Sequence, residues 1–111
     1  MYDRAFILMQ QSHWGESIEI FNDLIQATAN NPLVYDQMSL AMEKSGRISE
    51  AIEANLQALE IDSDYRHAHL NLGFMYNELG QEDRSDYHFE KYLELSPDTP
   101  YEVQVMEAMK P

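Results

Sequence analysis

The side chains of this 111-residue chain that could do chemistry do not form a metal-binding pattern. His67 and His69 lie two residues apart, which on a helix points them about 200° away from each other, so they cannot share a metal ion. His13 and His88 have no ligand cluster near them in the sequence. The segment "DSD" at 62–64 begins like a calcium loop but lacks the glycine and final glutamate of an EF-hand. We therefore expect His69 to be a buried structural histidine, 62–64 to be a turn, and no metal site to exist.

Motifs for nucleophilic and cofactor chemistry are also missing. The chain has no cysteine, which excludes disulfides, thiolate catalysis and cysteine zinc sites. It contains no G-x-S-x-G, P-loop or dinucleotide-binding glycine pattern. The numerous carboxylates are expected on solvated faces of helices. The sequence thus predicts a protein that is not an enzyme and uses no cofactor.

Charge and hydropathy narrow the kinds of partner. Twenty acidic residues against seven basic ones give a formal charge of −13, which would repel nucleic acid and anionic membranes and permits a basic partner. No apolar run approaches the roughly 18 residues that a membrane span requires. The N-terminal "MYDRAFILMQQ" does not resemble a signal peptide. We expect a cytoplasmic protein whose partner is neither nucleic acid nor membrane.

Helical periodicity dominates the sequence. In "SEAIEANLQALEI" (49–61), Ile52, Leu56 and Leu59 form one apolar stripe, and strand signals are poor throughout. Turn signals cut the chain into six segments of roughly 10 to 15 residues and a short seventh. The breaks lie at Gly15, 30–32, Gly46, 62–64, Gly80 and 96–100. An all-α protein with short turns follows.

The small residues of the chain recur every 34 residues, which is typical of stacked helix pairs. The three sets are Ser12, Gly46 and Gly80, which should each close the first helix of a pair; Ala5, Ser39 and Gly73; and Ser17, Ala51 and Ser85. Small residues let helix axes approach closely. We therefore expect Gly73, in the middle of "HLNLGFMYNELGQ" (69–81), to face Ser85 where two helices cross.

At this period the chain resembles the tetratricopeptide repeat, whose pattern is W-x2-L-G-x2-Y, A-x3-F and P. The matching positions in its third copy are His69, Leu72, Gly73, Tyr76, Ser85, Phe89 and Pro97. The resemblance implies an all-α, right-handed superhelical array of antiparallel helix pairs (an α-solenoid). The predicted divisions are 1–31 (an N-terminally truncated first repeat), 32–65, 66–99, and a capping helix at 100–111.

Several positions depart from that pattern. Asn55 replaces a buried aromatic, Asp86 replaces an aliphatic residue, and Tyr92 replaces an alanine, so the last repeat should pack atypically. We place Trp14 in the turn between the first two helices, packing over it. A last helix at 99–110 should be capped by Asp98 or Thr99. It should cover the third repeat through its apolar residues, Val103, Met106 and Met109.

The resemblance also implies a binding groove, lined by the first helix of each pair. Carried over position by position, it is formed by Tyr2, Phe6, Met9, Leu33, Asp36, Gln37, Leu40, Glu43, His67, Leu70, Asn71, Phe74 and Asn77. Relatives that clamp a terminal carboxylate use lysine, arginine and asparagine, whereas Tyr2, Asp36 and His67 stand at such sites here. We therefore expect an apolar floor with acids and amides at its rim, suited to an apolar peptide with basic flanks or to a partner helix.

These residues predict a protein–protein interaction module. Two alternatives stay open at this stage. One is a self-assembling, homo-oligomeric scaffold formed through the last helix or the flank beside Tyr2 and Phe6. The other, implied by the resemblance, is a chaperone for a secreted or assembling subunit.

Overall fold

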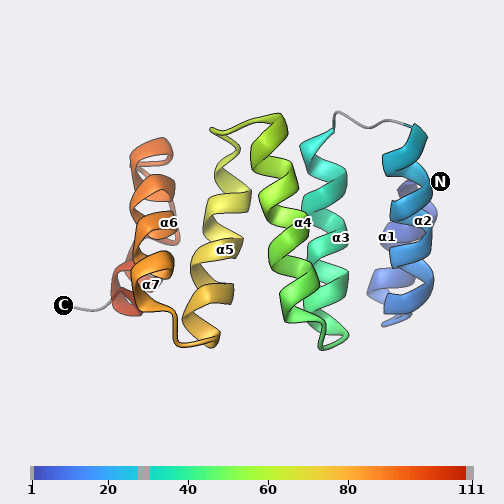
Figure 1. The fold of residues 1–111 in the computed structure, drawn as a ribbon, viewed down its shortest axis with the longest axis horizontal. Coiled ribbons are helices and arrows are strands. Elements are labelled where there is room, and N and C mark those ends of the chain that lie inside the picture. The colour runs from blue at the N-terminus through green and yellow to red at the C-terminus, as the bar shows by residue number, and fades with distance from the viewer. Residues whose placement is uncertain (1, 28–30, 110–111) are drawn as a thin grey trace. The chain divides into compact units, whose positions relative to one another are not determined.

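The computed structural model describes residues 2–27 and 31–109, with the side chains of residues 2 and 3 left out of the description. In this part of the chain there are seven α-helices and no strand (Figure 1). They are α1 (Tyr2–Gln10), α2 (Trp14–Ala27), α3 (Pro32–Lys44), α4 (Ile48–Ile61), α5 (Arg66–Glu78), α6 (Glu82–Leu95) and α7 (Glu102–Ala108). The predicted all-α class, with six longer helices and a short last one, is confirmed.

The helices belong to two compact units. The first, Met1–Ser63, contains α1 to α4, in which α1 packs on α2, α2 on α3, and α3 on α4. The second, Asp64–Pro111, contains α5, α6 and α7, and α5 packs on α6. The helices of each pair, α1–α2, α3–α4 and α5–α6, run in opposite directions (Figure 1). The division into repeats at 31, 65 and 99 stays a prediction.

The turn inside each helix pair has the same geometry at the same place in the 34-residue register. Ser12, Gly46 and Gly80 all adopt the left-handed conformation, with φ of 63°, 84° and 74°. Each turn is closed by a backbone bond that spans five residues: His13 N–H to Leu8 O, Arg47 N–H to Met42 O, and Gln81 N–H to Tyr76 O, at 2.8 to 2.9 Å. These are Schellman closures, which satisfy carbonyls at the end of the first helix.

The prediction was wrong about where the first pair turns. We expected a break at Gly15 with Trp14 in the turn, but α2 begins at Trp14 and contains Gly15 in its first turn. Ser12 alone supplies the left-handed residue that the closure needs, so the next helix can start two residues later. Trp14 is half-buried, and its carbonyl accepts a hydrogen bond from Ser17 Oγ at 2.8 Å.

The predicted contact of Gly73 with Ser85 is confirmed. Ser85 Oγ donates to the Gly73 carbonyl at 2.8 Å across the α5–α6 contact, and both residues are buried. The hydroxyls of Ser17 and Ser39 instead donate to carbonyls of their own helices. The reason for glycine at 73 is the ring of Phe89: a Cβ there would lie 2.9 Å from Phe89 Cγ and closer still to Cδ1 and Cε1. The absent side chain makes room for an aromatic ring.

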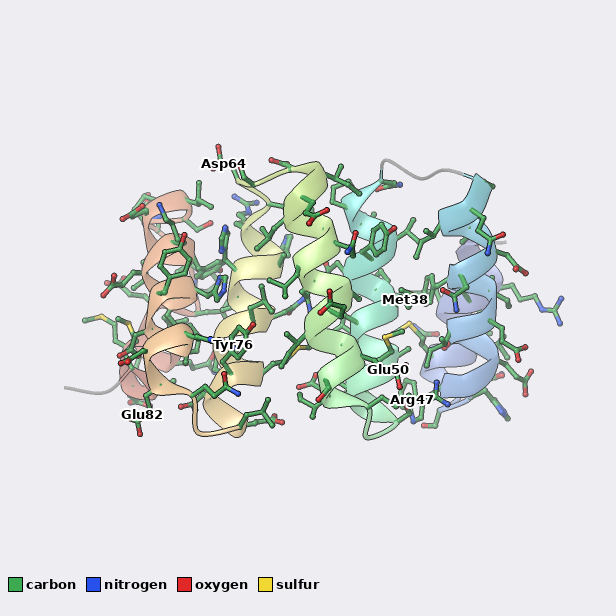
Figure 2. All side chains as sticks on the ribbon, viewed as in Figure 1. Met38, Arg47, Glu50, Asp64, Tyr76 and Glu82 are labelled. Carbon is green, nitrogen blue, oxygen red and sulfur yellow. The ribbon has the colours of Figure 1, made fainter. Side chains whose placement is uncertain are left out.

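Buried residues in the first unit include apolar side chains and one amide. Phe21, Val34 and Met38 are buried, and in Figure 2 the Met38 side chain lies on the α2-facing side of α3. Asn55, at the position where an aromatic was expected, is also fully buried. Its Nδ2 donates to the Ala51 carbonyl at 3.0 Å, so the amide is not buried without a hydrogen bond.

The last helix differs from the prediction in both its start and its buried face. It begins at Glu102 after Tyr101, and Thr99 Oγ1 accepts the Tyr101 N–H at 3.2 Å instead of capping a helix. Val105 is the fully buried residue, whereas Val103 and Met106 are 67% and 59% exposed. Val105, Ala108 and Met109 are spaced i, i+3 and i+4, so they share the face that packs on Phe89 and Tyr92 of α6. Position 110 lies outside the described residues.

Two helical glycines, Gly73 and Gly15, allow a matched test of the Phe89 contact. Gly73→Ala should gain about 1 kcal/mol of helix propensity and lose about 1–3 kcal/mol to overpacking against Phe89. A net fall in melting temperature of several degrees follows. Gly15→Ala has nothing within 4 Å of its new Cβ and should leave the melt unchanged or raise it. Equal thermal denaturation curves for both variants, measured by circular dichroism, would contradict the contact.

The left-handed serine gives a second prediction. Ser12→Gly should stabilise the chain by about 0.5–1 kcal/mol, because glycine adopts positive φ without the steric cost that a Cβ adds. The reciprocal change Gly46→Ser should destabilise it by a similar amount. Urea denaturation measures both, and a destabilised Ser12→Gly variant would exclude the turn geometry.

Candidate interaction surface

In the first unit three of the candidate residues lie on a side of α3 that is separate from its main core residues. Asn31 caps this helix by accepting the Leu33 N–H at 3.0 Å, and Pro32 occupies its first turn. This start places Leu33, Gln37 and Leu40 at i, i+4 and i+7, on one side of the helix. The residues buried in the core, Val34, Met38 and Ala41, lie on another side.

The exposure of the first-unit candidates varies widely. Phe6 and Leu33 are 44% and 40% exposed, and Met9, Gln37, Leu40 and Glu43 are half-buried. Asp36 is only 6% exposed, so its side chain offers little surface to a partner. The Tyr2 side chain lies outside the described residues. Among the candidates of this unit, Phe6 and Leu33 are therefore the most exposed apolar side chains.

In the second unit the candidates share one face of α5, but they differ in what surrounds them. His67 is exposed, and Leu70, Asn71, Phe74 and Asn77 are half-buried. Leu70 and Phe74 pack against a cluster formed by Phe89, Tyr92 and Val105. The Phe74 and Phe89 rings meet edge to face, with centroids 4.9 Å apart and planes at 78°. The apolar part of this face is thus continuous with the core of its unit.

A cavity of about 410 Å³ beside His67 was not anticipated from the sequence. It is lined by Arg66 and His67 from the start of α5, by Tyr92 and Leu95 of α6, and by the segment Ser96–Tyr101. No sequence signal marks it, because half of its wall is the irregular connection between α6 and α7. Its lining mixes one guanidinium, one carboxylate and two tyrosines, so it has no single-sign electrostatic character.

A pair of buried histidines was also not predicted from the sequence. His69 is buried, as expected, but His88, for which we found no cluster, lies against it with the two Nδ1 atoms 3.0 Å apart. Such a contact requires one ring to donate from Nδ1 and the other to accept there. Tyr76, labelled in Figure 2, stacks on His88 from α5 at 5.7 Å, and Tyr87 meets it edge-on at 5.0 Å. The pair and its aromatic neighbours join α5 to α6.

Burial lowers the pKa of His88, and the proximity of His69 lowers it further, from the ordinary 6.5 to about 4. The histidine is therefore neutral in the folded chain at neutral pH. Across the described residues there is no group of three or more histidine, cysteine or acidic side chains placed to hold a metal ion. The histidine pair packs α5 against α6.

The chain contains antiparallel helix pairs whose turns have the same geometry every 34 residues. This arrangement defines an all-α repeat protein. Two family models match the chain, one described as "TPR repeat" over residues 43–80 and one as "Tetratricopeptide repeat" over residues 67–99. The chain belongs to the tetratricopeptide-repeat family. Within the described helices, none is long and apolar enough to cross a membrane.

Comparison with known proteins agrees on the fold. A curated relative, the TPR repeat-containing thioredoxin TTL4 of Arabidopsis thaliana, is 26% identical over 74% of this chain but only 12% of its own length. The second TPR domain of human RPAP3, solved in complex with the HSP70 peptide SGPTIEEVD, superposes with a TM-score of 0.88 at 24% identity, over 98% of this chain and 92% of that one. The Yersinia enterocolitica secretion chaperone SycD, solved with a peptide of the translocator YopD, gives 0.90 at 13% identity, over 97% and 86%.

The depressed pKa of His88 predicts a pH-dependent stability. Below pH 6.5 the unfolded chain takes up a proton at this histidine, while the folded chain does not until about pH 4. Stability should therefore fall as the pH drops from 6.5 to 4, by at most about 3 kcal/mol. His88→Asn retains a hydrogen-bonding group near His69 and does not titrate. Urea midpoints of the two chains should converge between pH 6.5 and 4.5; parallel curves would show that His88 is not buried neutral.

Proposed function

We propose that this chain is a non-enzymatic protein-interaction module, and that it binds a segment of a partner protein on the exposed faces of its first helices, α1, α3 and α5. The family consists of helical modules known for protein interactions rather than catalysis, and two of the similar structures described above hold peptides of other proteins. The described residues carry no metal cluster that would suggest another role.

The observation that carries this proposal is the second apolar face of α3. Val34, Met38 and Ala41 bury one side of the helix, yet Leu33 and Leu40 keep apolar surface on another side. A helix that serves only the core is expected to be polar on its remaining surface. Phe6 of α1 adds a further exposed aromatic side chain in the same unit. Exposed apolar groups of this kind stabilise a complex by leaving water when a partner covers them.

The polar residues of the candidate faces suggest the chemistry of the partner. Gln37 on α3 and Asn77 on α5 have amides that can both donate to and accept from a bound main chain. The net charge of −13 favours lysine or arginine at the partner's flanks. The RPAP3 domain was solved with a peptide that ends in Glu-Glu-Val-Asp, whereas the positions where relatives use cations hold Tyr2, Asp36 and His67 here. We therefore favour an apolar segment with basic flanks over an acidic C-terminus.

The two alternatives, a self-assembling scaffold and a chaperone for a secreted or assembling subunit, rest on fold-level resemblance and on exposed side chains near the chain ends. Neither has a specific contact in its favour. Binding of a partner segment is preferred because it accounts for the apolar face of α3.

The test compares two double variants of equal charge. Phe6→Asp/Leu33→Asp alters the proposed face, and Val103→Asp/Met106→Asp alters exposed residues of α7, outside it. Captured partners are quantified by mass spectrometry from extracts of the source organism. The amount of captured partner should fall at least tenfold for the first variant and should be unchanged for the second.

Leu40 and Phe74 are avoided as test sites because they are half-buried, and Phe74 packs on Phe89. Helicity of both double variants is checked by circular dichroism. Retention of the same partners by a folded Phe6→Asp/Leu33→Asp chain would contradict the proposed face.

A further inference from the structure

The last helix, α7, packs on an apolar cluster that also holds residues of the proposed binding face in the second unit. Its fully buried Val105 joins Phe89 and Tyr92 of α6 in one apolar cluster, and Ala108 and Met109 pack against the same cluster. Leu70 and Phe74, two of the five candidate residues of α5, pack there too. Figure 1 shows α7 beside α6 at the C-terminal end of the chain. The chain's own helix therefore covers apolar residues of α6 that adjoin the proposed face of α5.

Among the described helices α7 is the shortest. It has seven residues, whereas α1 has nine and α2 to α6 have thirteen or fourteen. Helices shorter than about 12 residues are marginal without tertiary contacts. One side of α7 supplies those contacts, while Val103 and Met106 on the other side stay in water. Opening of α7 alone exposes far less apolar surface than opening of α5 or α6.

We propose that α7 is a displaceable occupant of the apolar surface that Phe89 and Tyr92 form beside Leu70 and Phe74, and that the partner segment that replaces it is a short amphipathic helix. The buried side of α7 shows which side chains fit: a β-branched residue, a small one and an unbranched apolar one at i, i+3 and i+4, as in Val105, Ala108 and Met109. This proposal rests on the proposed function and specifies the ligand at one of its faces.

Tethering makes this arrangement a form of autoinhibition. A segment joined to its site by a short connection competes at an effective concentration of the order of millimolar. Any helix added in trans must overcome that competition. Its apparent affinity is therefore lowered by the ratio of chains with α7 bound to chains with α7 released. A substitution that releases α7 should raise the affinity for an external helix by this factor, without changing the face itself.

The test uses the full chain and a fluorescent synthetic peptide of sequence DTPYEVQVMEAM, which corresponds to residues 98–109. Val105→Asp places a charge at the buried anchor and should release α7, whereas Val103→Asp adds the same charge to the exposed side of the same helix. We expect the peptide to bind the Val105→Asp chain at least tenfold more tightly than the intact chain, in fluorescence anisotropy. The Val103→Asp chain should behave like the intact one. A peptide with aspartate in place of its second valine should not bind.

Three results would overturn the proposal. The first is a folded Val105→Asp chain that does not bind the peptide, and the second is equal binding by the Val103→Asp chain. The third is a concentration-dependent dimer of the intact chain, seen by light scattering and abolished by Val105→Asp, which would assign the face to a second copy.

Hydrogen exchange on the intact chain decides the matter if Val105→Asp fails to fold. The amides of Val105 and Met109, which bond to Tyr101 and Val105, should exchange at least 100-fold faster than the most protected amides of α5. Equal rates would mean that α7 opens only with its unit, and would overturn the proposal. Because the test of the proposed function alters Phe6 and Leu33 in the first unit, failure of either idea can be recognised separately.

Discussion

The contact among Gly73, Ser85 and Phe89 is the constraint on which the second unit depends. Ser85 bonds to the Gly73 carbonyl, and the Phe89 ring occupies the space that a side chain at 73 would fill. The same ring packs edge to face on Phe74 and joins the cluster that holds Val105. The missing side chain at Gly73 of α5 thus lets α6 approach. The Phe89 ring that fills the space packs both on Phe74 of the candidate binding face and in the cluster with Val105 of α7. The helix-propensity cost of glycine is offset by the burial of a whole aromatic side chain.

The sequence predicted features that a single residue type encodes locally. Ser12, Gly46 and Gly80, which are 34 residues apart, adopt the left-handed conformation that closes the turn of each helix pair. Small buried residues mark the helix crossings. It failed where tertiary contacts choose between similar residues. Val103, Val105 and Met106 are all apolar, and only packing against Phe89 selects Val105. His69 and His88 are 19 residues apart and meet only because α5 and α6 pair. The cavity wall from Ser96 to Tyr101 is irregular and has no periodicity to detect.

The candidate residues form two surfaces of different character. In the first unit, Phe6 and Leu33 are exposed on helices whose core-facing sides are already filled, so a partner can contact them without rearrangement. In the second unit, Leu70 and Phe74 are shared between the proposed face and the core, and they pack on the cluster that holds Val105 of α7. Which candidates are available could not be read from the repeat pattern, since that pattern specifies position on a helix and not what covers it.

The central claim is that partners contact the first helix of each pair and not the second. Photo-crosslinking tests this claim directly, because it captures a partner of any identity. A photoreactive amino acid is placed at Leu33 on α3, or at the exposed Glu53 on α4, and adducts are analysed in extracts of the source organism. We predict a discrete partner adduct from position 33 and none from position 53. The same adduct from position 53, with none from position 33, would contradict the account.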